Sequence, residues 1–184
     1  MIEILKGKVK TVYDTDDAEK VLIEFHDKVT AGNGLMTEYP PEKGATCCLI
    51  SALLFELLEK RGIKTHYLEL PSLNKMICRK LTIVPVEVIC RNIAAGSIVQ
   101  TTTLVEGTLI QPPIVEFFLK DDSKNDPLLT PDRVRLMRHN PDPLVERTKE
   151  INHELQSLFT LMGMELVDFK LEFGYDVHGD LYLA

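Results

Sequence analysis

The chain has 184 residues, 45% of them apolar and 27% charged, and its 21 basic and 28 acidic residues give a net charge of -7. That balance argues against a general nucleic-acid-binding or anionic-membrane surface, although a local basic pocket is compatible with it. No run approaches the roughly 20 apolar residues of a membrane span, and the charged N-terminus is too short for a signal peptide. We therefore expect a cytoplasmic globular protein of one large domain or two small ones.

The first third of the chain is predicted to be a small sheet followed by a helix. Strands are expected over 2–5, 8–13 and 21–25, with turns around Gly7 and over 14–17. Residues 26–44 form a glycine- and proline-bearing connection that is longer than most loops, and such loops are often functional. A helix is expected over 45–61 and should end at Gly62. Its apolar stripe includes Leu49, Leu53, Leu57 and Leu58.

In the remaining two thirds of the chain, the sequence predicts further strands around a few helices. Strands are expected over 65–70, 76–81, 85–91, 114–119, 165–173 and 180–183, with a turn at 178–179. A short helix is expected over 94–101, and a longer one should begin with Asp142 as cap and Pro143 at its first position and stop at Gly163. This pattern favours an α+β fold rather than a doubly wound sheet. We place a domain boundary near 81–85, which divides the chain into 1–82 and 83–184.

The stretch over 166–174 carries an alternating charge pattern. Asp168, Lys170 and Glu172 should point to one face of a strand, and the apolar residues between them to the other. A phosphate-handling site needs this mixture, because carboxylates hold a divalent cation and a lysine offsets developing negative charge. An ordinary solvated sheet face has the same pattern.

Lysines also follow a glycine near the N-terminus. Gly7 suits a tight turn, and Lys8 and Lys10 are expected to share one face of the following strand. Such a turn can direct backbone N–H groups and ammonium groups at a triphosphate, although it lacks the spacing of a Walker A loop. A basic edge strand that discourages aggregation is the alternative.

Arginine meets small residues where the strand over 85–91 ends. Arg91 is followed by Gly96 and Ser97, and a bidentate arginine beside a close backbone approach can receive a phosphate or an oxyanion. A plain strand-to-helix connection with a surface arginine is equally compatible. The aspartates over 121–126 suggest a cation or a polar substrate, but they fail the EF-hand pattern, so a solvated turn is favoured there.

Cysteines and histidines carry little chemistry in this sequence. Cys47, Cys48, Cys78 and Cys90 form no C-x-x-C pair and have no histidine cluster beside them, so they are interpreted as reduced core thiols. No serine or cysteine sits in a G-x-S-x-G elbow. Hydrolase and redox functions are therefore disfavoured.

Taken in order, these motifs resemble the SAICAR synthetase (phosphoribosylaminoimidazole-succinocarboxamide synthase) family. Residues 84–97 and 166–174 look like its two signature segments, and residues 6–13 look like its phosphate-binding hairpin. The segments over 30–34, 43–44 and 118–127 fall in the same order as in the family. The resemblance covers essentially the whole chain.

The resemblance implies an ATP-dependent ligase of de novo purine synthesis in an α+β fold of two parts, with ATP in the cleft between a small N-terminal sheet domain and a larger one. The family joins L-aspartate to carboxyaminoimidazole ribotide (CAIR) through an acyl phosphate and releases ADP and phosphate. Mg²⁺ is its metal, and its members form small homo-oligomers. No nucleic-acid or membrane partner is implied.

Residue roles are carried over from the same resemblance. Nucleotide binding is implied for Gly7, Lys8, Lys10, Val12, Glu87 and Lys120, with Val12 under the adenine and Glu87 at its edge. Substrate binding is implied for Arg91, Ser97, Asp126, Asp168 and Lys170. Of these, Asp168 and Lys170 would be catalytic, and Glu172 would hold magnesium.

Three departures from the family pattern accompany the resemblance. Asn33 stands where an aspartate is usual, and Cys47 and Cys48 stand where an asparagine is more usual. The family also continues beyond its last strand with an acidic D-E-x-S-P-D-x-x-R segment, whereas this sequence stops at Ala184, so we expect a C-terminal part incomplete relative to the family. The alternatives are an ATP-binding but catalytically incomplete domain and a small-molecule kinase of related fold.

Overall fold

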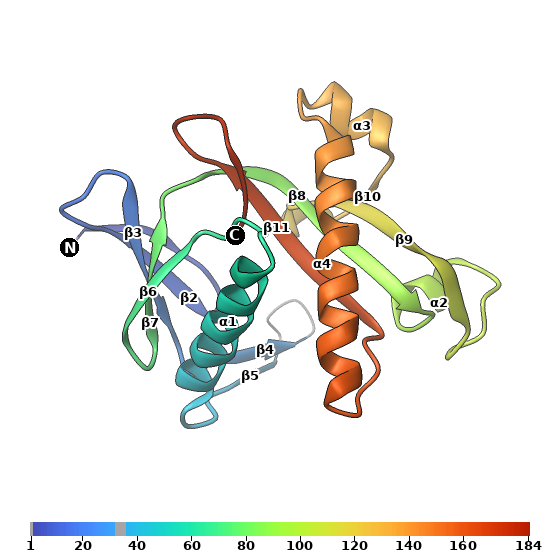
Figure 1. Cartoon of the computed structure of the whole chain (residues 1–184), viewed down its shortest axis with the longest axis horizontal. Coiled ribbons are helices and arrows are strands. Elements are labelled where there is room, and N and C mark those ends of the chain that lie inside the picture. The colour runs from blue at the N-terminus through green and yellow to red at the C-terminus, as the bar shows by residue number, and fades with distance from the viewer. Residues whose placement is uncertain (1, 32–35) are drawn as a thin grey trace. The chain divides into compact units, whose positions relative to one another are not determined.

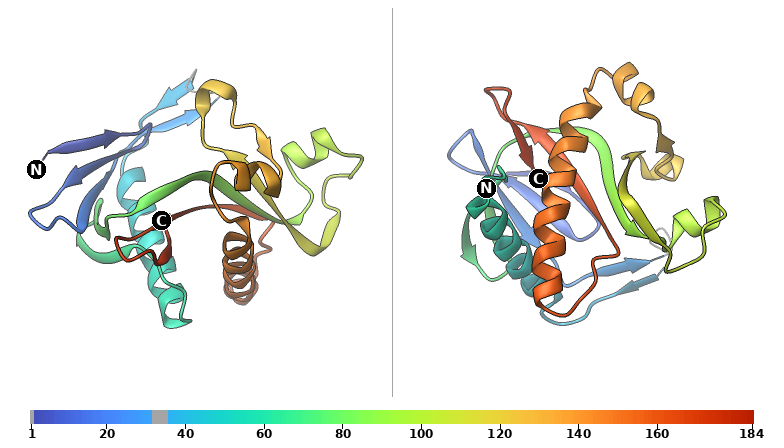
Figure 2. Two further views of the ribbon diagram at one scale, coloured as in Figure 1. Left: turned by 90° about the horizontal axis from the view of Figure 1, so that it is seen from above. Right: turned by 45° about the vertical axis from the view of Figure 1, so that its right-hand side comes forward.

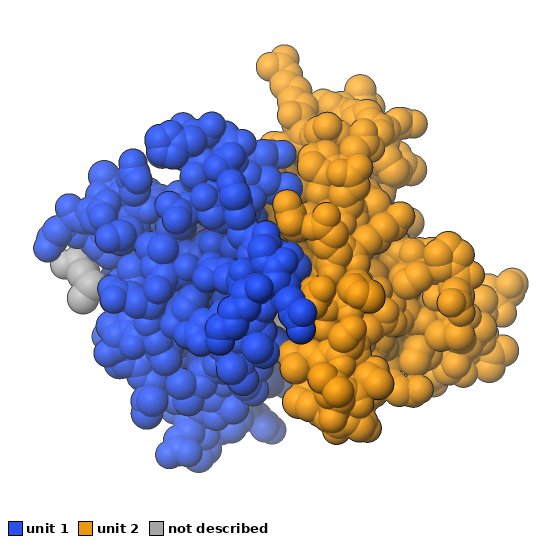
Figure 3. Space-filling model, viewed as in Figure 1, with its two compact units in different colours: residues 1–82, 174–184 blue, residues 83–173 orange. Residues whose placement is uncertain are grey.

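The computed structural model describes residues 2–31 and 36–184. Contacts between Cα atoms group the chain into two compact units, one formed by 1–82 with 174–184 and the other by 83–173 (Figure 3). The predicted domains differ from these units in the last 11 residues, which group with the first unit. None of the helices in the described ranges combines the length and the apolar character that a membrane span needs.

The first unit contains a five-stranded antiparallel sheet in the order β1-β2-β3-β7-β6 (Figure 1). Its strands are β1 (Glu3–Lys6), β2 (Lys10–Asp14), β3 (Lys20–Phe25), β6 (Tyr67–Ser72) and β7 (Lys75–Arg79). Helix α1 (Lys43–Lys60) contacts β3, β6 and β7. The core between sheet and helix includes Val21, Phe25, Cys48, Ala52, Tyr67, Met76 and Cys78.

Helix α1 begins where the chain passes very close to the backbone of β3. A Cβ atom added at Gly44 would lie 2.6 Å from the Phe25 carbonyl oxygen, so only glycine fits there. The Asp27 carboxylate accepts hydrogen bonds from the backbone N–H of Gly44 at 2.7 Å and of Glu42 at 3.1 Å. The Glu42 side chain makes no capping hydrogen bond, so the Asp27 carboxylate takes that role for two of the N–H groups at the start of the helix.

Two predictions for this unit are wrong. Leu49 and Leu53 of the predicted stripe are 40% and 58% exposed, while Cys48 and Ala52 are buried, because α1 is apolar on most of its circumference. The connection over 26–44 also contains strands, since β4 (Val29–Ala31) pairs antiparallel with β5 (Met36–Glu38). The predicted motif residues Gly32, Asn33 and Gly34 lie outside the described residues.

The second unit is built on a sheet whose strand order is β10-β9-β8-β11-β12. Its strands are β8 (Thr82–Ile93), β9 (Leu109–Leu119), β10 (Leu128–Leu129) and β11 (Asp168–Tyr175), and β12 (Leu181–Leu183) groups with the first unit. Its helices are α2 (Ser97–Thr101), α3 (Pro131–Leu136), α4 (Pro141–Leu161) and the 3-10 turn η1 (Asp122–Lys124). Figure 2 shows α4 lying along the sheet, and α4 contacts β9.

Strand alternation gives this sheet one apolar face. Val84, Val86, Val88 and Cys90 of β8 are at most 1% exposed. Leu144, Ile151 and Leu155 of α4 are also buried. On the same side, Asn92 and Asn152 of α4 exchange two 2.9 Å amide hydrogen bonds, and Asn92 also donates to the Leu166 carbonyl at 3.0 Å. This network fixes α4 and the start of β11 against the end of β8.

Several boundaries in this unit differ from the prediction, and those of α4 and β9 have a clear physical reason. Helix α4 is capped by Asn140, whose side chain accepts from the Asp142 N–H, so Pro141 rather than Pro143 takes the first position. Strand β9 begins at Leu109 instead of residue 114 and includes Pro112 and Pro113. These prolines are tolerated because β10 pairs with β9 only at Phe117 and Phe118, so that side of β9 is an edge at the prolines.

The core-thiol prediction is confirmed for three cysteines. Cys48, Cys78 and Cys90 are 0% exposed, and all four cysteines are free. Burial raises the pKa of Cys78 to about 12 and of Cys90 to about 11. Cys47 is half-buried at the margin of the same core as Cys48.

Candidate functional site

The second-unit sheet has a second face, opposite the apolar one. A cluster of charged side chains lies on this face, which we call the charged face. Its members come from β8, β9 and β11 and from the residue that follows β9. They are Glu87, Arg91, Glu116, Lys120, Asp168, Lys170 and Glu172. The register places Ile89 opposite Glu116 and Glu87 opposite Phe118, so β8 and β9 contribute to one side of the sheet.

Two ion pairs occupy one part of the charged face. Lys170 Nζ lies 2.7 Å from Glu87 Oε1, and Lys120 is paired with Glu172. Glu87 is 13% exposed while Lys170 is 51% exposed, so the lysine reaches a carboxylate that is held closer to the sheet. Acid and base therefore alternate here, as the sequence pattern predicts.

Arg91 organises the other part. Its side chain is only 5% exposed, and its Nε lies 2.6 Å from Glu116 Oε2. Nη1 lies 3.3 Å from Asp168 Oδ2 and 3.4 Å from the Ala95 carbonyl, and Nη2 donates to Ser97 Oγ at 2.9 Å. Gly96, with φ of 62°, turns the chain so that Ser97 begins α2 beside the guanidinium. The structure thus brings together Arg91, Ser97 and Asp168.

Asp126 is used differently from the other candidate substrate residues. Its Oδ1 accepts from the Asp121 backbone N–H at 2.9 Å, which closes the turn over 121–126. Hydrogen bonds from Lys124 and then from Ser123 hold the pKa of Asp121 below its ordinary value. The acidic loop is therefore largely satisfied by its own groups, and Asp126 is not among the partners of Arg91.

The N-terminal hairpin belongs to the first unit. The Gly7 N–H donates to the Lys10 carbonyl at 2.8 Å, and a Cβ at Gly7 would lie 3.3 Å from that oxygen, which supports the predicted turn. Lys8 lies in this turn and β2 starts only at Lys10, so the prediction that both lysines share a strand face is wrong. Lys10 Nζ lies 4.7 Å above the centre of the Phe25 ring, and Val12 packs against the core.

Glu116 is the member of the charged face that the sequence did not single out. It is an isolated acid within the apolar segment Ile114–Leu119, which is the signal that could have marked it. Its importance becomes visible only when Arg91 of the neighbouring strand is placed beside it. Within the described residues no three histidine, cysteine or acidic side chains gather as a preformed metal cluster.

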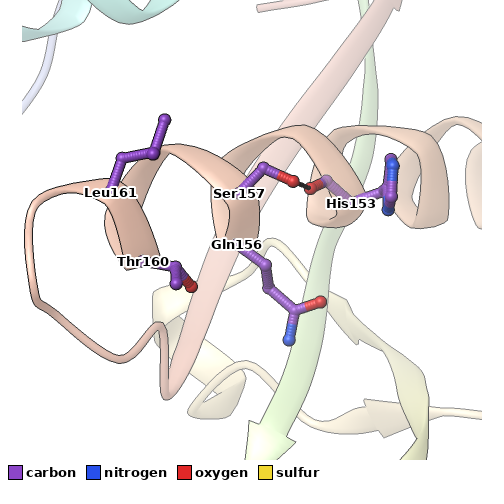
Figure 4. Close-up of a pocket in the computed structure, with 5 residues that line it drawn as sticks. All are labelled: His153, Gln156, Ser157, Thr160 and Leu161. Atoms are coloured by element: carbon purple, nitrogen blue, oxygen red, sulfur yellow. Dashed lines mark hydrogen bonds between the residues drawn. The ribbon is translucent and has the colours of Figure 1, made fainter.

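A shallow hollow along the last turns of α4 contains none of these residues. It is lined by His153, Gln156, Ser157, Thr160 and Leu161 (Figure 4). The Ser157 hydroxyl donates to the His153 carbonyl at 2.9 Å, so it is engaged within the helix. The charged face is accordingly the better candidate for chemistry in this unit.

Comparisons with known proteins agree on one family. The SAICAR synthetase family model matches residues 3–184. The chain is 43% identical to the phosphoribosylaminoimidazole-succinocarboxamide synthase of Prochlorococcus marinus subsp. pastoris, over 98% of this chain and 76% of that one. It is 42% identical to the enzyme of the same name from Methanobrevibacter smithii, with the same coverage.

Solved structures agree with these relatives. The fold matches a type-2 SAICAR synthetase in complex with ADP with a TM-score of 0.95 and 36% identity, covering 99% of this chain and 79% of that one. It matches the enzyme from Ehrlichia chaffeensis with a TM-score of 0.94 and 35% identity, covering 99% and 80%. These relatives are named as the ligase, which supports the ligase over the kinase alternative. The chain belongs to the SAICAR synthetase family.

Proposed function

We propose that this ATP-dependent ligase of purine biosynthesis binds and activates its ribotide substrate on the charged face of the second unit. The observation that carries the proposal is Arg91, a buried arginine with Ser97 Oγ at 2.9 Å and Asp168 at 3.3 Å. Planar, bidentate donors of this kind suit phosphate and carboxylate groups. Arg91 and Ser97 would hold the anionic groups of CAIR, and Asp126 stays a predicted substrate contact.

The chemical difficulty of the reaction is that a carboxylate is a poor electrophile at neutral pH. Transfer of the γ-phosphoryl group of ATP to the CAIR carboxylate forms an acyl phosphate and releases ADP. The amine of L-aspartate then attacks the acyl carbon, the C–O bond to phosphate breaks, and the amine loses a proton as the amide forms. Catalysis of such transfers depends mostly on positioning and charge neutralisation.

The charged side chains offer these contributions. Lys170 would neutralise charge that develops on the phosphoryl and carboxyl oxygens, and Asp168 would orient the imidazole substrate. Both lie on β11 two residues apart, so the strand sets their spacing. Lys170 pairs with Glu87, a partner that it would have to share or exchange on binding substrate.

Nucleotide binding is assigned to two sets of residues, each in its own unit. In the first unit, the Gly7 turn with Lys8, Lys10 and Val12 would contact the phosphates and the adenine. In the second unit, Glu87 and Lys120 would contact the nucleotide. The similar structure that was solved with ADP supports nucleotide binding.

Magnesium fits the donors of the charged face. Mg²⁺ is usually held by one or two carboxylates together with substrate phosphates, so Glu172 can serve without a preformed cage. Bound there, the ion would offset phosphate charge.

The proposal is tested by ADP release from ATP and Mg²⁺, with CAIR and L-aspartate each omitted in turn. We expect release that requires CAIR and a stable succinocarboxamide product that requires both substrates. The ligase mechanism would be refuted by ADP release that occurs without CAIR and aspartate. It would also be refuted by ADP release that requires CAIR but yields no amide product when aspartate is present. Light scattering on the same preparation tests the expected homo-oligomer, and fractionation of the source cells tests the cytoplasmic location.

A further inference from the structure

The donors of Arg91 are not equally engaged. The Nε–Glu116 bond, at 2.6 Å, is the shortest of the four that the guanidinium makes. The two bonds at Nη1, to Asp168 at 3.3 Å and to the Ala95 carbonyl at 3.4 Å, are longer than the usual 2.9 Å of an N–H···O bond. Nε is therefore tightly held and Nη1 is loosely held, while Nη2 keeps a bond of ordinary length to Ser97 Oγ at 2.9 Å.

This difference matters because the guanidinium is planar. An acceptor at Nε fixes the rotation of the plane and so decides where the Nη1 and Nη2 edge points. Glu116 can do this because its cross-strand neighbour is Ile89, two residues before Arg91 on the same face of β8. Its side chain is 22% exposed, against 38% for Asp168, so it is the more enclosed of the two carboxylates.

The charge of Arg91 also distinguishes Glu116 from Asp168. A buried arginine needs a compensating anion whether or not substrate is present. Asp168 cannot serve this purpose throughout the reaction if it also contacts the imidazole, whereas Glu116 pairs only with Arg91 among the described residues.

We propose that Glu116 is a positioning residue of the ligase, which holds Arg91 by Nε so that its Nη edge is presented to the anionic groups of CAIR. The inference rests on the proposed function for the identity of the ligand. Glu116 itself need not touch substrate.

The test compares Glu116→Gln with Glu106→Gln, which makes the same chemical change at an exposed position of the same unit. CAIR affinity is measured by calorimetry and the KM of each substrate by initial rates. Glu116→Gln keeps an acceptor for Nε but removes the charge that strengthens the bond, so we expect it to raise the Kd and KM for CAIR by about tenfold. The kcat and the KM values for ATP and aspartate should stay within about twofold of wild type. The lost interaction stabilises bound CAIR equally in the ground state and in the transition state, so only CAIR binding is weakened. Glu106→Gln should match wild type throughout.

A second background separates positioning from a general structural role. Arg91→Lys lacks Nε, so adding Glu116→Gln to it should change CAIR affinity by less than about twofold if Glu116 acts through that atom. An equal loss in both backgrounds, or a Glu116→Gln affinity within about twofold of wild type, overturns the proposal.

Measurements on the wild-type chain separate a failure of the proposed function from a failure of the Glu116 proposal. Wild-type chain that binds CAIR without forming the amide contradicts the ligase assignment, and the affinity ratio still decides the role of Glu116. Wild-type chain that binds no CAIR overturns both.

Discussion

Because Gly44 lies so close to the end of β3, we predict that replacing it by alanine destabilises the protein, opposite to the usual effect in a helix. Replacing a helical glycine by alanine ordinarily stabilises a helix by about 1 kcal/mol. At Gly44, the added Cβ would meet the Phe25 carbonyl oxygen at 2.6 Å and the His26 carbonyl carbon at 2.9 Å. Real Cβ contacts essentially never fall below 3.0 Å, so one backbone must move by about 0.4 Å.

Neither backbone can move freely. Phe25 is paired with Lys10 across the sheet, and its N–H donates to the Asn74 carbonyl at 2.8 Å. Shifting α1 instead would stretch the 2.7 Å bond from the Gly44 N–H to Asp27. Overpacking costs about 1–3 kcal/mol and a lost cap about 1 kcal/mol, so the net loss after the helix gain is about 2 kcal/mol.

The assay is thermal unfolding of Gly44→Ala followed by circular dichroism. A loss of about 2 kcal/mol should lower Tm by about 4–8 °C in a chain of this length. Thr46→Ala, an exposed change one turn into the same helix that adds no atoms, should leave Tm nearly unchanged. A Gly44→Ala protein that melts at or above the wild-type temperature would show that the close approach is not a constraint.

Three further changes test other parts of the molecule. Lys170→Met should lower kcat/KM by about 100-fold or more through lost charge neutralisation, with little change in Tm because the side chain is 51% exposed; undiminished turnover would remove Lys170 from the site. Asn152→Leu should cost about 1–3 kcal/mol in urea unfolding because it leaves the buried Asn92 amide without its reciprocal partner, and an unchanged midpoint would contradict this. Burial, with a smaller effect of the Lys10 ammonium, lowers the pKa of His66 from 6.5 to about 3. Between pH 6.5 and pH 3 the unfolded chain therefore binds a proton that the folded chain does not, and the free energy of unfolding falls as the pH falls. Between pH 7 and pH 5 the wild type should therefore lose about 2 kcal/mol more unfolding free energy than His66→Gln, and equal losses would refute the argument.

The sequence predicts the charged strand well because a two-residue period leaves little choice. Alternation in β11 puts Asp168, Lys170 and Glu172 on one face, and the structure agrees. Glycine positions were equally predictable, since Gly62 and Gly163 have positive φ at the expected helix ends and Gly179 has positive φ in the expected turn.

Other features depended on information that one segment does not contain. The apolar stripe of α1 was mistaken because apolar residues occupy most of the circumference of the helix, and only packing decides that Cys48 and Ala52 face the sheet. The sequence N-P-D-P over 140–143 offers two overlapping cap-and-proline signals, and the first is used. Glu116 could not be assigned because its partner Arg91 is 25 residues away and is brought beside it only by strand pairing.

One buried thiol in each unit can report the local unfolding of that unit. A protonated thiol that solvent does not reach reacts with alkylating reagents only when the surrounding structure opens, so its labelling rate measures the free energy of that opening. Cys78 lies in the first unit and Cys90 in the second, both fully buried with a raised pKa. Mass spectrometry of pulse-labelled peptides can thus show, without any engineered probe, whether the two units unfold together or one before the other.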